Sequence, residues 1–102
     1  MTHTEIGLRR IAVMSNSHGQ VATLRVGAGD FRIGDIVDGG NARRQGLTVT
    51  LWFSVRDRPE LDRQLRAYPG AVINLGGYRV EVDEVSEDSD GSYWAFLTVM
   101  LP

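Results

Sequence analysis

The clearest hydrophobic pattern in the chain is the alternation over residues 47–55, LTVTLWFSV. Every second residue from Leu47 to Val55 is apolar, and the positions between them hold Thr, Thr, Trp and Ser. Alternation with a period of two predicts a β-strand that turns one face to the core. Trp52 falls on the other face, so this large side chain is expected to point away from the core.

Two further runs predict strands with particular features. Over residues 78–85, YRVEVDEV, the apolar positions alternate until Val85, which falls out of step. One extra residue in the strand would restore Val85 to the core, so we predict a β-bulge near Asp83–Glu84. The last run, residues 92–101, is apolar on both faces, which predicts a strand covered on both sides.

Glycine-rich and polar clusters separate the apolar runs at short intervals: SNSHG, GAGD, DGGNARRQG, LGG and EDSDG. We interpret these clusters as turns. Short strands at regular spacing with turns between them are typical of a sandwich or a barrel. The sequence therefore predicts one all-β domain over residues 1–102, an antiparallel sandwich of about seven strands that is immunoglobulin-like in outline. A small β-barrel is the alternative.

The stretch LRVGAGDFRIG at residues 24–34 is echoed by LRAYPGAVINLG at residues 65–76. Aligning the chain on this echo predicts two imperfect half-repeats, residues 6–46 and 47–101. The echo also bears on residues 58–67, where a capping-box spacing from Asp57 to Glu60 suggests a short helix. We expect at most one helical turn over residues 59–62, followed by a strand from about Arg63.

The amino-acid composition excludes several classes of protein. A chain of 102 residues with 42% hydrophobic and 24% charged residues can fold without a disulfide or a metal. It has no cysteine, which excludes a disulfide scaffold, a Cys-ligated zinc site and a thiol nucleophile. No apolar stretch approaches the roughly 18 residues of a membrane span, and the N-terminal run is too short for a signal-peptide core. We expect a cytoplasmic protein that does not bind membranes.

Charge argues against nucleic acid as a partner. The net charge is −2, and all 11 basic residues are arginine. A protein without a net positive charge attracts the negatively charged phosphate backbone of nucleic acids only weakly. Arginine, glycine, alanine and valine are favoured by GC-rich codons, so the expected source is a bacterium or a phage.

Groups suited to catalysis are few. Ser15, Ser17 and His18 lie close together, but adjacency does not orient a base against a nucleophile, and we interpret this stretch as a polar turn. The acidic stretch that includes EDSDG lacks the distal glutamate of a calcium loop. We expect no enzyme, no bound metal and no cofactor.

Two surfaces are candidates for binding. The first is aromatic and apolar, and the side chains expected to contact a partner or ligand are Trp52, Tyr78, Trp94, Phe96 and Met100. A loop or the chain termini covering these side chains is the alternative. The second is electrostatic, and it sets four arginines against an acidic hairpin: Arg43, Arg44, Arg56 and Arg58 on one side, and Glu87, Asp88 and Asp90 on the other.

These surfaces favour a non-catalytic protein-interaction or assembly module that binds itself or another protein. The alternative is a binder of a small apolar ligand held in a cavity between Trp52, Tyr78 and Trp94. An enzyme that uses His18 and nearby acids is the third hypothesis.

Overall fold

The computed structural model describes residues 7–37 and 43–102, apart from the side chains of Val37 and Arg43. Within these residues the chain forms strands joined by short turns, with one 3₁₀ turn. The elements are β1 (Leu8–Met14), β2 (Ser17–Val21), β3 (Leu24–Val37), β4 (Arg43–Val55), η1 (Pro59–Leu61), β5 (Arg63–Ala67), β6 (Val72–Leu75), β7 (Tyr78–Glu87) and β8 (Tyr93–Met100).

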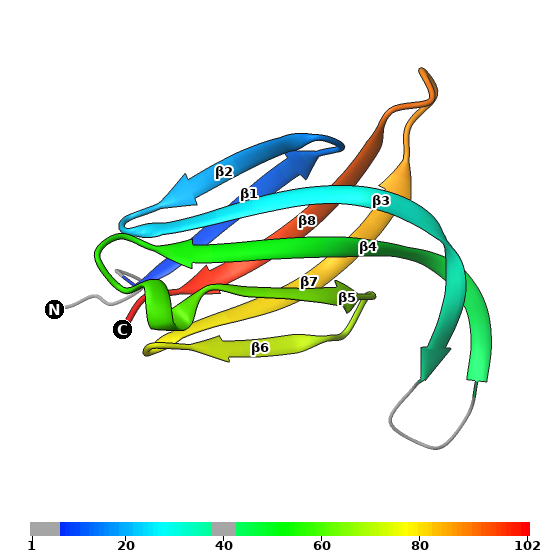
Figure 1. Ribbon diagram of the computed structural model, residues 1–102. Coiled ribbons are helices and arrows are strands. Elements are labelled where there is room, and N and C mark those ends of the chain that lie inside the picture. Colours follow the sequence, from blue (N-terminus) through cyan, green and yellow to red (C-terminus); the bar gives the residue numbers. More distant parts are fainter. Residues whose placement is uncertain (1–6, 38–42) are drawn as a thin grey trace, which may run out of the picture.

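The strands form two four-stranded antiparallel sheets that lie face to face, in the orders β1-β8-β7-β6 and β2-β3-β4-β5 (Figure 1). The predicted all-β sandwich is confirmed, with eight strands rather than about seven. Neighbours in each sheet are consecutive in the chain, apart from β1 beside β8. This order is an up-and-down one, unlike the Greek-key connections of immunoglobulin domains. The described strands do not close into a barrel, because the ladders do not join β1 to β2 or β5 to β6.

The core lies between the two sheets and is built by alternation. Leu24 and Val26 of β3, Leu51 of β4 and Val80 of β7 are fully buried, as is Val99 of β8. Their neighbours in sequence point outward, so each sheet has one apolar inner face, as the pattern over residues 47–55 predicts. This inner packing leaves the two outer faces as the surfaces on which binding residues can lie.

Two local predictions are confirmed. The β7–β8 register shifts between Val82 and Glu84, and this bulge brings Val85 to 8% exposure in the core. The single helical turn is η1, and β5 follows it from Arg63. Pro59 fits the first turn because its fixed φ suits the start of a helix, where a missing N–H costs nothing.

Other predictions are wrong. The GAGD stretch lies inside β3 rather than in a turn, since Gly27 and Gly29 pair with Trp52 and Thr50 of β4. Ser17 and His18 of SNSHG, which we interpreted as a polar turn, lie in β2 and pair with β3. Strand β8 is not covered on both sides, since Phe96 and Met100 on its outer face are 37% and 42% exposed. The turn predictions fail because pairing with a neighbouring strand, which the local sequence does not show, holds these glycine and polar residues in a sheet.

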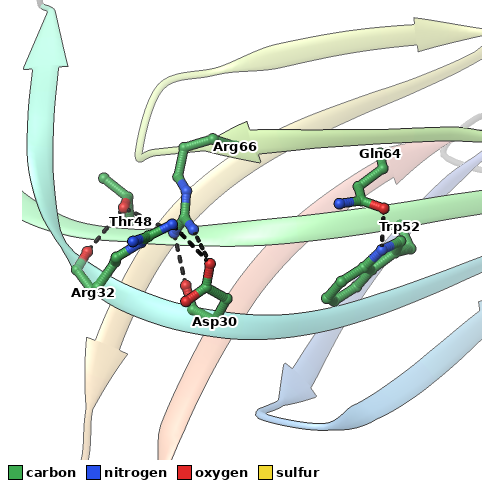
Figure 2. Close-up of polar contacts among 6 residues, drawn as sticks. All are labelled: Asp30, Arg32, Thr48, Trp52, Gln64 and Arg66. Atoms are coloured by element: carbon green, nitrogen blue, oxygen red, sulfur yellow. Dashed lines mark hydrogen bonds and ion pairs between the residues drawn. The ribbon is translucent and has the colours of Figure 1, made fainter.

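A bulge in β3 explains the position of Asp30. The β3–β4 register shifts between Gly29 and Arg32, and Asp30 has a φ of 49°. Arg66 of β5 reaches across β4 to this bulge, donating to the Asp30 carbonyl at 2.7 Å, to the Asp30 carboxylate and to Thr48 Oγ1 at 3.1 Å (Figure 2). The arginine thereby supplies the donors that keep a non-glycine residue in the left-handed region.

The half-repeats stay a prediction. The proposed boundary between residues 46 and 47 falls inside β4, and β4 pairs with β3 along its length. The two proposed halves are therefore joined by main-chain pairing within one sheet.

Candidate functional site

Trp52 lies at the centre of the outer face of the β2-β3-β4-β5 sheet. The strand registers place His18, Gly27, Trp52 and Gln64 in one row across the four strands. The indole remains 42% exposed, and its Nε1 donates to Gln64 Oε1 at 2.6 Å (Figure 2). One large aromatic side chain is therefore both accessible and fixed in orientation.

Two glycines of β3 make room for this indole. A Cβ on Gly29 would lie 3.1 Å from Trp52 Cζ3, and a Cβ on Gly27 would lie 3.7 Å from Trp52 Cε3. The six-membered ring thus lies against the main chain of β3, in space that larger side chains would fill. Glycine inside a strand often marks such a close approach.

A shallow depression of about 520 Å³ lies beside Trp52. It is lined by the small residues Gly27 and Ser54 and by His18, Arg25, Trp52, Phe53, Asp62, Arg63 and Gln64. Phe53 and Arg63 are opposite each other in the register and share the inner side of the sheet, so their side chains do not lie on the face of Trp52. A smaller hollow of about 230 Å³ adjoins it, shares Arg25 and Ser54, and adds Arg56. The depression exists because small residues of β3 and β4 lie between these longer side chains.

The outer face of the other sheet carries Trp94, Phe96 and Met100 of β8, as the alternation predicted. The register adds Met14 of β1, which lies opposite Trp94 and is 40% exposed. The rings of Trp94 and Phe96 stack with centroids 6.4 Å apart. These four side chains define what we call the β8 face: Met14, Trp94, Phe96 and Met100.

Charged residues flank the β8 face with opposite signs. Arg10 of β1 lies opposite Thr98 on one side, and Glu81 of β7 lies opposite Thr98 on the other. Glu84 of β7 pairs in register with Phe96. Glu81 also receives a 3.1 Å hydrogen bond from Arg79. The apolar centre thus has Arg10 on its β1 side, and Glu81 and Glu84 on its β7 side together with Arg79, which lies opposite Met100 and pairs with Glu81.

Asp88 links the acidic hairpin to the β8 face. Its carboxylate accepts hydrogen bonds from Trp94 Nε1 at 2.9 Å and from the backbone N–H groups of Asp90 and Ser92. The bond from Trp94, followed by that from Ser92, holds the pKa of the Asp88 carboxyl below its usual value. Asp88 therefore acts as a turn cap that orients the indole, in addition to carrying surface charge.

The structure separates several residues that the sequence grouped. Tyr78 is 5% exposed in the core, and its hydroxyl lies 2.7 Å from Thr23 Oγ1. Trp52 and Trp94 lie on the outer faces of opposite sheets. These three side chains consequently do not line one cavity.

The arginines are also apart. Arg44 lies near the start of β4, whereas Arg56 and Arg58 follow its end. Arg58 pairs with Glu60 and holds the pKa of that carboxyl below its usual value. Arg43 begins β4, and its side chain is outside the described residues. Glu87, Asp88 and Asp90 lie together at the end of β7 and in the following turn, which projects from the sandwich (Figure 1).

The sequence interpretation missed Met14, Arg25 and Gln64. Each takes its place from strand register, which brings residues far apart in sequence onto one face. One signal was present: Gly27 and Gly29 are two apart in an otherwise alternating run, which on a strand leaves a gap on one face.

Comparisons of the chain with protein-family models, with curated proteins and with solved structures gave no match. Among residues 7–37 and 43–102, no three His, Cys, Asp or Glu side chains gather as metal ligands would. The described residues also form no helix long and apolar enough to cross a membrane. The function is therefore argued from the two outer faces.

Proposed function

We propose that the protein is a non-catalytic assembly module that pairs with a second copy of itself through the β8 face. The observation that carries the proposal is the apolar centre of Met14, Trp94, Phe96 and Met100, with Arg10 on its β1 side and Glu84, which has no ion pair among the described residues, on its β7 side. Aromatic residues and methionine are enriched at the cores of protein interfaces, and the charged rim sets orientation. From the composition alone, we expect the protein to act in the cytoplasm of a bacterium or of a phage-infected cell.

The positions of the charged residues beside the β8 face favour one symmetric arrangement of the two copies. A two-fold axis parallel to β8 would place β7 of the second copy over β1 of the first, so that Arg10 meets Glu81 and Glu84 twice across the interface. An axis across the strands would instead place like charges together. Arg10 and Glu84 make no ion pair within residues 7–37 and 43–102, which favours them as the intermolecular pair.

The test is molar mass in solution, measured by sedimentation equilibrium over a range of protein concentrations at low and high salt. We expect a dimer that weakens in salt and still persists, because the rim is screened and the apolar centre is not. Phe96→Asp should give a monomer, whereas Ile33→Asp, at an apolar position 64% exposed on the other sheet, should leave the dimer intact.

Charge reversal tests the orientation. Arg10→Glu alone should weaken the dimer, and Arg10→Glu combined with Glu84→Arg should recover part of the loss, since residue 84 is then reversed in both symmetric contacts while Glu81 is unchanged. A wild-type chain that is monomeric at every concentration contradicts the proposal. Dimerisation that survives Phe96→Asp, in a variant shown to be folded by circular dichroism, contradicts the assignment to this face.

A further inference from the structure

We propose that the depression beside Trp52 binds a neutral, linear oligosaccharide, with one sugar ring stacked on the indole and the next sugar hydrogen-bonded by Arg25 and Asp62. The site lies on the outer face of the β2-β3-β4-β5 sheet, whereas the β8 face belongs to the other sheet. It is therefore separate from the surface proposed for self-association, and either proposal can fail without the other.

A row of polar side chains lies two residues along the strands from Trp52, on the same face of the sheet. Arg25 of β3 is opposite Ser54 of β4 in the register. Asp62 comes two residues before Gln64, and its backbone is extended, with a ψ of 134°, so the two side chains point to the same side. Arg25, Ser54 and Asp62 all line the depression beside Trp52.

The indole is already fixed in position for a ring with an apolar face. Its Nε1 donates to Gln64 at 2.6 Å, and its six-membered ring lies against Gly27 and Gly29 (Figure 2). Binding would not need to order this side chain, so little affinity is lost to its immobilisation. A pyranose ring presents a face of C–H groups that packs on an aromatic surface, and its hydroxyls project sideways toward polar neighbours.

The polar groups beside the indole suit hydroxyl groups rather than an ion. Arg25 only donates hydrogen bonds, ionised Asp62 only accepts them, and Ser54 does both. These three side chains make no hydrogen bond or ion pair with another described residue, so they are available to a ligand. A sugar hydroxyl donates and accepts, and can therefore bond to each of them.

The balance of charge and polarity excludes two other kinds of ligand from the best fit. The charges of Arg25 and Asp62 cancel, so this row gives neither an anion nor a cation an advantage. A wholly apolar ligand would cover the same two groups without bonding to them, which costs free energy. A neutral polyol avoids both penalties.

The arrangement along the strands favours a chain over a single sugar. Ser54 lies two residues beyond Trp52, about 7 Å along β4, which is comparable with the length of one sugar unit. The adjoining hollow of about 230 Å³ continues in that direction, because it shares Arg25 and Ser54 and adds Gln20 and Arg56. An oligosaccharide lying along β4 would therefore contact the indole with one ring and polar side chains with the following ones.

The experiment titrates the ¹⁵N-labelled protein with cellotetraose, β-1,4-mannotetraose and maltotetraose, and follows the Trp52 Nε1–H resonance. We expect this resonance to shift on saturation with at least one of the three. Calorimetry gives the affinity for that saccharide and for tetragalacturonic acid. The acid should bind no more tightly than the neutral chain, since the row beside the indole has no net charge.

Matched variants locate the site, with the affinity again measured by calorimetry. Arg25→Met and Asp62→Ala should each lower the affinity about tenfold, since each removes a hydrogen bond to a charged group. Trp52→Ala should abolish measurable binding. Arg58→Gln is the control, because Arg58 is exposed, lies outside the depression and should leave the affinity unchanged.

Four results would overturn the proposal. Tetragalacturonic acid that binds at least about tenfold more tightly than every neutral chain would make this an anion site. Unchanged affinity in both Arg25→Met and Asp62→Ala would remove the polar row from the site. A proline-rich decapeptide that shifts the Trp52 resonance, with no saccharide bound, would assign the indole to peptide recognition. No shift with any of the three saccharides, in a protein whose spectrum is that of a folded chain, would remove the site.

Discussion

The hydroxyl of Tyr78 lies 2.7 Å from Thr23 Oγ1 and accepts a 3.1 Å hydrogen bond from the Thr23 backbone N–H. Tyr78 begins β7 of one sheet, whereas Thr23 lies in the turn between β2 and β3 of the other sheet. Most contacts between the layers are apolar and non-directional. This polar contact fixes how one end of the first sheet lies against the second.

Tyr78→Phe should therefore destabilise the fold by about 1 kcal/mol, since it keeps the ring in the core and removes the partner of two Thr23 groups. The measurement is the free energy of unfolding by chemical denaturation. Tyr68→Phe is the matched control, because the Tyr68 hydroxyl has no hydrogen-bond partner among the described residues. Equal stability of the two variants would mean that the Tyr78–Thr23 contact contributes nothing.

Tyr78 also shows how far the sequence determines the fold. Its alternation with Val80 and Val82 predicted a strand with a buried face, and the misplaced Val85 predicted the bulge. These predictions are correct because every second residue of a strand is buried in the core, so the alternation can be seen within a single stretch of sequence. The same rule placed Trp94, Phe96 and Met100 together on one side of β8.

The candidate sites are less accessible to such reasoning. Trp52 was expected on an outer face, but its contacts come from Gly27 of β3 and Gln64 of β5, which only the strand register brings together. The grouping of Arg44 with Arg56 failed for a related reason. Residues close in sequence lie far apart when an extended strand of 13 residues separates them.

The hydrogen bonds to Asp88 make a prediction about pH. Its folded-state pKa is lowered by the bond from Trp94 Nε1 and by the backbone N–H of Ser92, so its ionised form stabilises the fold. This contribution is present above the ordinary aspartate pKa of about 3.9 and is lost as the pH falls through the lower folded-state value. Asp88→Asn, which no longer titrates, should show a shallower loss of stability between about pH 5 and pH 2.

The measurement is the free energy of unfolding of both proteins across that range, with Trp94 emission recorded in the folded state. Asp90→Asn is the control for removing one surface charge, since the Asp90 carboxylate accepts no hydrogen bond from the described residues. Parallel pH profiles for wild type and Asp88→Asn would contradict the role of this carboxylate.

The β6–β7 turn makes a prediction about backbone strain. Gly76 has a φ of +56°, and a Cβ there would lie 2.4 Å from Leu61 Cδ1 of η1. Gly76→Ala should cost about 1–2 kcal/mol, because alanine is disfavoured in the left-handed region and Leu61 would have to move. Gly19→Ala is the comparison, at a strand position where the new Cβ meets Ile11 and Val13 at 3.5 Å. Chemical denaturation that ranks the two variants equally would contradict this account of the turn.

Gly29 and Gly27 provide a matched test of how the Trp52 indole is held against β3. A Cβ at Gly29 would approach Trp52 Cζ3 to 3.1 Å and force the ring to shift, whereas a Cβ at Gly27 would make an ordinary 3.7 Å contact. Gly29→Ala should therefore disturb the bond from Nε1 to Gln64 and move the Trp52 Nε1–H resonance, assigned by its loss in Trp52→Phe. Gly27→Ala should leave that resonance nearly in place, and both variants should remain folded, because alanine is favoured over glycine in a strand by roughly 0.5–1 kcal/mol. If Gly29→Ala leaves the resonance unmoved, the indole is not held over β3 as the structure has it.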